Sequence, residues 1–154
     1  MYKKLCVLSL GALVFALPTT QAYGQISSIL SAAGDAGYKN ALSRHYTNMI
    51  LDTMNRCSIM VQEKLAFEER VASTTCGQLT LGNKADPSYD TDLTEIVPDL
   101  KIIIPDATNK DTSFTLTTDK AVSDEICQNI NAKKSILDIK YTCVDGIVTA
   151  EYQL

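Results

Sequence analysis

The 154-residue sequence contains no tryptophan, a single histidine, four prolines and seven glycines. A collagen-like chain would need a regular glycine period, and a low-complexity or disordered chain would show a proline and glycine excess or an apolar deficit. The apolar fraction of 45% and the charged fraction of 21% are instead those of an ordinary globular protein. The sequence also has no internal repeat of about 20 to 50 residues, so a repeat architecture is not expected.

The shortage of histidine and the cysteine spacing limit the chemistry that the chain can support. His45 is the only histidine and no Cys-x-x-Cys is present, so a zinc site or a thioredoxin-type redox motif is poorly supported. No serine or cysteine near His45 has the context of a catalytic nucleophile. We therefore expect no catalytic residues and no cofactor, and we expect His45 to be a partly buried or solvent-facing side chain.

The first 24 residues have the features of a secretory signal peptide. Two lysines precede an apolar run from Leu5 to Leu17, which is too short to span a bilayer. The small residues favour cleavage after Gly24, and cleavage after Ala22 is nearly as good. We expect residues 25–154 to form one secreted or periplasmic domain that has no transmembrane anchor after cleavage.

Cleavage would also remove Cys6 and leave an even number of cysteines, which in an exported chain predicts two disulfides. The four that remain are Cys57, Cys76, Cys127 and Cys143. We favour pairing in sequence order, which requires the helix that carries Cys57 to end near Glu69, because a longer helix would put Cys76 out of reach. The alternative joins Cys57 to Cys143 and the other two cysteines to each other.

Acidic residues are concentrated in one stretch of the chain. Without the two lysines of the leader, 12 basic residues remain against 18 acidic ones, so nucleic acid and anionic membranes are not expected as partners. The excess lies between Lys84 and Glu125, in a stretch that begins with a loop carrying Asp86, Asp90, Asp92 and Glu95. These carboxylates could bind calcium, but the loop lacks the glycine and spacing of an EF-hand, and we favour a solvated loop with turn-forming aspartates.

A helix is predicted from about Lys39 to about Glu69. No proline interrupts this region, and apolar residues recur every three or four positions. This stripe comprises Leu42, Tyr46, Ile50, Met54, Cys57, Val61 and Leu65, widened by Met49 and Met60, whereas Ser43, Asp52, Arg56, Glu63 and Arg70 lie off it. Asp52 and Arg56 have the i,i+4 spacing of an ion pair. Gly34 and Gly37 weaken the helix upstream, so residues 26–33 could be a separate turn, an extension or a loose tail.

Short runs rich in β-branched residues follow and predict strands at Gln78–Leu81, Leu100–Ile104 and Ser113–Thr117. The acidic loop from Lys84 to Asp99 has room for a short helix. A second short helix is predicted by Val122, Ile126 and Ile130 at i,i+4 spacing, with Ser123 as its cap and Lys133 and Lys134 at its far end.

The clearest local signal is Asp145-Gly146, which predicts a two-residue hairpin turn. Folding the chain about it pairs Val144 with Ile147, Tyr141 with Ala150 and Ile139 with Tyr152. One face is then apolar, formed by Leu137, Ile139, Tyr141, Cys143, Val148, Ala150, Tyr152 and Leu154. Because that face needs a cover, we expect an α+β fold: a long N-terminal helix packed on a small antiparallel sheet, with a second short helix before a C-terminal β-hairpin.

This order of elements resembles the globular domain of type IV pilins and pilin-like proteins, particularly the type IVb group. The local likeness lies in the strand Phe114–Thr117, the helix that bears Cys127, and the terminal hairpin with Cys143. The resemblance implies that the segment bracketed by these two cysteines is a surface for assembly or adhesion. Residues 25–48 lack the apolar helix start of a pilin and carry polar and charged residues. The resemblance therefore implies an accessory or secreted relative, or a subunit assembled by other contacts.

Three functions compete at this point. The first is an exported, pilin-like interaction or structural protein that contacts a pilus or secretion apparatus. The second is an unrelated periplasmic binding or inhibitor module. An enzyme is the third and least favoured, because the spacing identifies no paired carboxylates and no nucleophile–base pair.

Overall fold

The computed structural model describes residues 21–68, 70–81, 84–133 and 139–154, with side chains from Gly34 onward. The chain divides into two units, residues 1–36 and 37–154, and all packing described below lies within the second. Most of the expected signal peptide, together with Lys134 and Leu137, lies outside the described residues.

The helix α1 runs from Gln21 to Glu68. Its end confirms the predicted one, and its start shows that residues 26–33 extend the helix. Gly34 and Gly37 are exposed in it, and a Cβ at either position would meet nothing within 4 Å. A glycine costs a helix only about 1 kcal/mol relative to alanine, which is too little to end a helix of this length.

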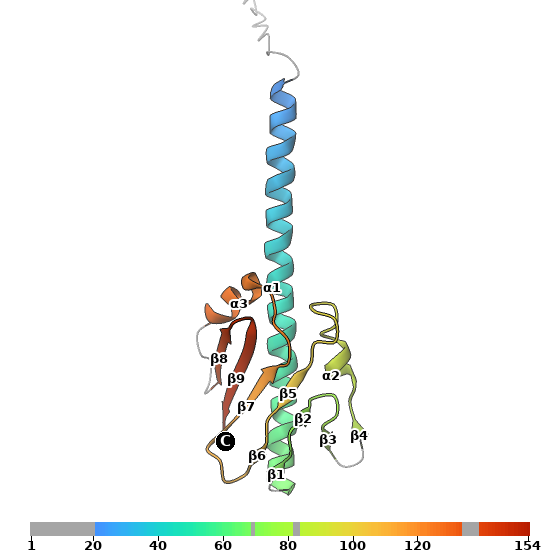
Figure 1. Cartoon of the computed structure of the whole chain (residues 1–154), viewed down its shortest axis with the longest axis vertical. Helices are drawn as coiled ribbons and strands as arrows, with labels where there is room; N and C mark the ends of the chain where they lie inside the picture. Colours follow the sequence, from blue (N-terminus) through green and yellow to red (C-terminus); the bar gives the residue numbers. More distant parts are fainter. Residues whose placement is uncertain (1–20, 69, 82–83, 134–138) are drawn as a thin grey trace, which may run out of the picture. The chain divides into compact units, whose positions relative to one another are not determined.

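A five-stranded antiparallel sheet lies beside the C-terminal part of α1 (Figure 1). Its order is β2-β5-β7-β9-β8, formed by β2 (Thr74–Thr75), β5 (Ile102–Ile104), β7 (Ser113–Thr118), β9 (Ile147–Gln153) and β8 (Ile139–Val144). Two small antiparallel pairs accompany it: β1 (Arg70–Val71) with β6 (Ala107–Thr108), and β3 (Thr80–Leu81) with β4 (Lys84–Ala85). The expected α+β fold is confirmed.

Two short helices complete the domain. The helix α2 (Ser88–Thr91) lies in the acidic loop, where the sequence left room for one. The helix α3 (Asp124–Asn131) is the predicted second helix, and its N-cap Ser123 accepts a hydrogen bond from the backbone N–H of Ile126. Ile126 and Ile130 are buried, so α3 packs through the apolar side of the predicted i,i+4 pattern.

The apolar stripe of α1 forms much of the core. Ile50, Met54, Cys57 and Val61 are fully inaccessible to solvent, and Tyr46 is half-buried. Ser43 differs from the prediction, because it is buried rather than off the stripe. Its hydroxyl donates to the backbone carbonyl of Asn40 and accepts a hydrogen bond from the Asn129 side chain, so a small polar residue fits where α3 approaches α1.

The terminal hairpin has the predicted register. Val144 pairs with Ile147, and the pairing continues to Ile139 with Tyr152. Asp145 and Gly146 both have positive φ, at 52° and 79°, as such a turn requires. Leu154 was expected on the apolar face but is 49% exposed, because it lies beyond β9 and outside the core.

The strand predictions identify the elements but not their lengths. Only Thr80 and Leu81 of the first predicted strand pair with a neighbour, whereas the third extends by one residue to Thr118. The sequence pattern did not predict β1, β2, β4 or β6. Each contains only two residues, which is too short to show an alternation of side chains.

Candidate functional site

Both disulfides join cysteines in sequence order. Cys57 and Cys76 have Cα atoms 5.8 Å apart, and those of Cys127 and Cys143 are 5.3 Å apart. The favoured connectivity is confirmed and the alternative pairing is wrong. The reason is the one that the sequence suggested: α1 ends at Glu68, and the chain reverses through β1 and β2 to return Cys76 to the helix.

The segment between Cys127 and Cys143 is fastened to the sheet in a second way. The Asn131 side chain donates to the backbone carbonyl of Cys143 at 2.9 Å and accepts from its N–H at 2.8 Å. These are the bonds that a neighbouring strand would provide at β8, which is an edge of the sheet. The disulfide and Asn131 therefore hold α3 beside β8, and α3 presents the exposed Gln128 to solvent.

The four acidic residues of the loop differ in their burial and in their bonding partners. Asp90 is half-buried and accepts hydrogen bonds from the Thr75 hydroxyl and the Gly77 N–H. A Cβ at Gly77 would lie only 2.5 Å from the Asp90 carboxylate, so the glycine permits this approach. Asp86 accepts from the backbone N–H of Ser88. Hydrogen bonding by the Ser88 side chain, with this backbone bond adding to it, keeps the pKa of Asp86 below its usual value. Among the described residues, no group of three or more histidine, cysteine or acidic side chains could hold a metal ion.

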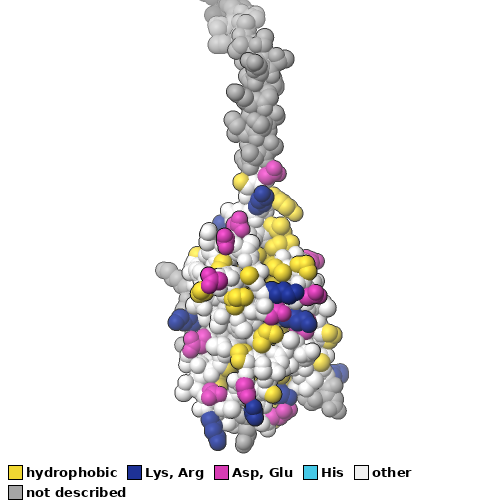
Figure 2. Space-filling model, viewed as in Figure 1, with side chains coloured by type: hydrophobic (Ala, Val, Ile, Leu, Met, Phe, Trp, Pro, Cys, Tyr) yellow, Lys and Arg dark blue, Asp and Glu magenta, His cyan; other side chains and the backbone are white. Residues whose placement is uncertain are grey.

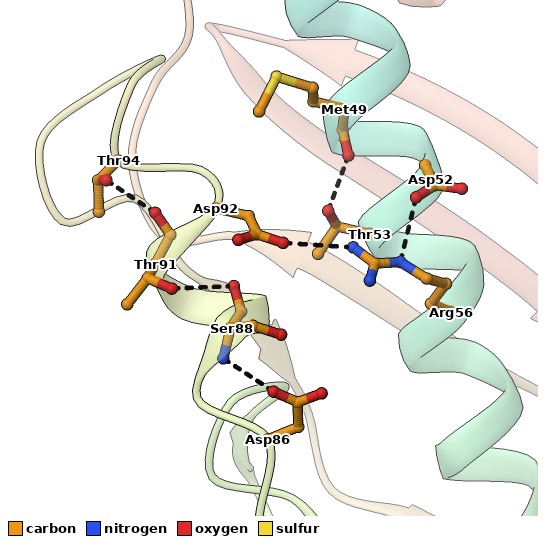
Figure 3. A network of polar contacts seen from close by, with 9 residues as sticks. All are labelled: Met49, Asp52, Thr53, Arg56, Asp86, Ser88, Thr91, Asp92 and Thr94. Atoms are coloured by element: carbon orange, nitrogen blue, oxygen red, sulfur yellow. Dashed lines mark hydrogen bonds and ion pairs between the residues drawn. The ribbon is translucent and has the colours of Figure 1, made fainter.

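The other two acids line a groove between α1 and the α2 loop. This acidic groove has a volume of about 380 Å³ and is lined by Met49, Asp52, Thr53, Arg56, Thr91, Asp92, Thr94 and Glu95. Arg56 lies between two of the acids, with its guanidinium 3.1 Å from the Asp52 carboxylate and 3.6 Å from that of Asp92 (Figure 3). The predicted i,i+4 ion pair is thus confirmed. The same guanidinium lies 5.0 Å from the centre of the buried Tyr89 ring, which is close enough for a cation–π contact.

A second groove lies between α1 and α3. This basic groove has a volume of about 360 Å³ and is lined by Arg44, Thr47, Asn48, Asn129, Ala132 and Lys133. Its two cations are exposed, and Lys133 donates to the Asn48 side chain at 3.1 Å. Within the described ranges, neither Arg44 nor Lys133 forms an ion pair with an acid.

The domain surface mixes side-chain types. Figure 2 shows acidic and basic side chains interspersed on one face, with hydrophobic side chains between them. Among the large exposed apolar residues that the structure describes, three belong to α1: Tyr38, Ile59 and Phe67, with 68%, 57% and 85% of their surface accessible. His45 is exposed and contacts the ring of its neighbour Tyr46, in agreement with the solvent-facing interpretation.

Sequence reasoning missed two side chains that join separate elements. Asn55 of α1 accepts hydrogen bonds from the hydroxyls of Tyr141 and Tyr152, and Asn131 of α3 bonds to the backbone of Cys143. An asparagine in a helix gives no sequence pattern that marks such a role. The contact between Arg56 and Asp92 was also missed, because it joins α1 to a loop whose course the sequence does not define.

Comparisons of the chain with protein-family models, with curated proteins and with solved structures find no match. Across the described part of the chain, no helix combines the length and apolar character that crossing a membrane requires. The two disulfides indicate an oxidising compartment such as the periplasm or the cell exterior.

Proposed function

We propose that the chain is an exported, pilin-like interaction protein, acting as an accessory or secreted component of a pilus or secretion system. The observation that carries the proposal is the segment from Cys127 to Cys143. There a short helix is held against the edge of an antiparallel sheet that packs on a long N-terminal helix. This is the arrangement that the pilin resemblance implies for an assembly or adhesion surface.

The helix α3 suits a binding role because it is held against the sheet while its outer side stays accessible. One disulfide and two hydrogen bonds hold α3, so little conformational entropy remains to be lost on binding. The exposed residues of α3 include Asp124, Glu125 and Gln128. A partner can therefore contact α3 without displacing its packed isoleucines.

Photo-crosslinking in the producing cell tests this function. A photoreactive phenylalanine analogue replaces the exposed Gln128, and the matched control places it at the exposed Ala72, outside the segment. We expect the α3 position to give an adduct that mass spectrometry identifies as a pilus or secretion-apparatus protein. Recovery of free protein without any such adduct, from a cell that assembles the apparatus, would contradict the proposal.

The second candidate is a periplasmic binding or inhibitor module, and the two grooves beside α1 favour it. Each has a volume in the range of small-molecule sites. This candidate predicts that the free domain from the crosslinking experiment carries a bound small molecule or inhibits a soluble enzyme. Native mass spectrometry of the exported protein would detect the first as an added mass.

A further inference from the structure

The two grooves beside α1 carry opposite charges. Arg44 and Lys133 give the basic groove two positive charges and no acid lines it. The acidic groove contains Asp52, Asp92 and Glu95 together with Arg56, which leaves two net negative charges. The two grooves thus carry net charges of equal magnitude and opposite sign.

The charges of Arg44, Lys133 and Glu95 are available for contact with another molecule. Among the described residues, the Arg44 side chain makes no hydrogen bond or ion pair, and the Lys133 ammonium bonds only to the neutral Asn48 side chain. Glu95 is exposed and likewise has no bonded partner within the part of the chain that the structure describes. The chain has more acidic than basic residues, so its composition does not predict a basic groove.

The two grooves cannot satisfy each other within one molecule. An α-helix turns by about 100° per residue, so Arg44 and Asn48 lie on one flank of α1 while Thr53 and Arg56 lie on another. Figure 1 shows α3 and α2 on opposite sides of α1. Complementary grooves on separate sides of one domain can meet only between two molecules.

We propose that the basic groove of one copy of this chain binds the acidic groove of a second copy. Arg44 and Lys133 of the first copy then face Glu95 and its neighbouring carboxylates on the second. Such a contact is heterologous, because it joins two different surfaces, and it generates a ring or an open chain of subunits rather than a closed dimer. The inference does not rest on the pilus or secretion assignment, since it needs only the charges on one domain.

Sedimentation of the purified exported protein tests the contact. We expect concentration-dependent association at low ionic strength that weakens at about 0.5 M salt, because exposed charges are screened beyond a few ångströms there. The double variant Arg44→Glu/Lys133→Glu makes both grooves acidic and should weaken association by about tenfold or more. Its matched control, Lys84→Glu/Lys110→Glu, makes the same change in net charge at exposed sites outside both grooves and should associate like the natural protein.

A charge-swap experiment makes the pairing specific. The variant Thr94→Lys/Glu95→Lys makes the acidic groove positive, so it also should not associate with itself. Mixed with Arg44→Glu/Lys133→Glu, it should form assemblies again, because every groove then meets one of opposite charge. Far-ultraviolet circular dichroism and the intact mass verify that each variant is folded and has both disulfides.

Three outcomes would overturn the inference. One is a natural protein that stays monomeric at millimolar concentration and low salt. The second is association that the groove variants leave unchanged. The third is folded variants that fail to assemble when mixed. A failure here leaves the proposed pilus or secretion role intact, because the crosslinking experiment at Gln128 is independent of self-association.

Discussion

Two asparagine side chains fasten separate parts of the domain. Asn55 of α1 accepts hydrogen bonds from the hydroxyls of Tyr141 and Tyr152, at 2.6 and 3.0 Å. Asn131 of α3 pairs with the backbone of Cys143 on β8. Each makes two hydrogen bonds that no apolar residue could replace, so each is more important for stability than its polarity and location suggest.

Replacing Asn131 by alanine should lower the free energy of unfolding by about 1 to 2 kcal/mol. Two hydrogen bonds are lost, and the Cys143 backbone groups are left without a protein partner at an edge strand. Urea denaturation measures the change. The matched control is Gln128→Ala, an exposed position on the same helix, which should change the free energy of unfolding by less than about 0.5 kcal/mol. Equal effects of the two substitutions would contradict the role given to Asn131.

The buried Tyr152 hydroxyl predicts a loss of stability in alkali. Burial raises the pKa of Tyr152 well above its usual value, with the neighbouring Tyr141 adding to the effect. In the unfolded chain a tyrosine ionises at about pH 10. Above that pH the unfolded state releases a proton that the folded state keeps, so the free energy of unfolding falls as the pH rises. Below it the contribution is fully present.

Urea unfolding at about pH 8 and above about pH 10 measures this term, with Tyr152→Phe as the comparison. The phenylalanine variant cannot ionise, so its stability should decline less over the same interval. The variant is expected to be less stable at neutral pH, because it loses the hydrogen bond to Asn55. Identical pH slopes in the two proteins would show that Tyr152 does not contribute.

Two glycines, one in a helix and one in a hairpin turn, should respond in opposite ways to substitution by alanine. Gly37 lies in α1 with open space around it, whereas Gly146 has φ of 79° and a Cβ there would approach Ala121 Cβ to 2.7 Å. Gly37→Ala should therefore stabilise the protein by about 0.5 to 1 kcal/mol. Gly146→Ala should destabilise it by about 1 to 3 kcal/mol, because the turn conformation is strained for any residue with a Cβ. Thermal unfolding of both variants under one condition checks the opposite signs.

The sequence predicted best those elements whose own residue pattern is long enough to determine their structure, whatever elements pack beside them. The stripe from Leu42 to Leu65 spans many helical turns, and the Asp145-Gly146 turn sets the register of two whole strands. The two-residue strands depend instead on which neighbour is near. Thr74 and Thr75 are in a strand because they pair with Ile104 and Ile103 of β5, a contact that no local pattern contains.

For the whole domain, the sequence could predict the layers but not the surfaces between them. The apolar stripe and the hairpin face imply that a helix covers a sheet, and they do so correctly. The two grooves arise where α2 and α3 approach α1, and that depends on loops whose course follows from tertiary packing. Arg44 and Lys133 lie 89 positions apart in the sequence, so their shared groove could not be predicted from spacing.

The two disulfides differ in how far solvent reaches them, and this difference predicts the order in which they are reduced. Cys57, which belongs to α1, and its partner Cys76 are completely buried, whereas Cys127 is only partly buried and its partner Cys143 is 6% exposed. A thiolate must reach a sulfur atom to attack a disulfide. In the folded protein the bond between Cys127 and Cys143 should therefore be reduced first. The bond between Cys57 and Cys76 should be reduced only after the protein unfolds.

Timed alkylation of the exported protein under mild reductant, followed by peptide mass spectrometry, measures the order. Cys127 and Cys143 should be modified before Cys57 and Cys76, and in urea the four should react at similar rates. Early loss of the bond between Cys57 and Cys76 would contradict the burial argument. Four thiols that alkylate without any reductant would show that neither bond forms on export, and would remove the basis for placing the protein in an oxidising compartment. The order also bears on α3. After the first reduction, the hydrogen bonds of Asn131 and the packing of Ile126 and Ile130 still hold the helix, so the Asn131→Ala variant should then give less of the crosslink formed from Gln128.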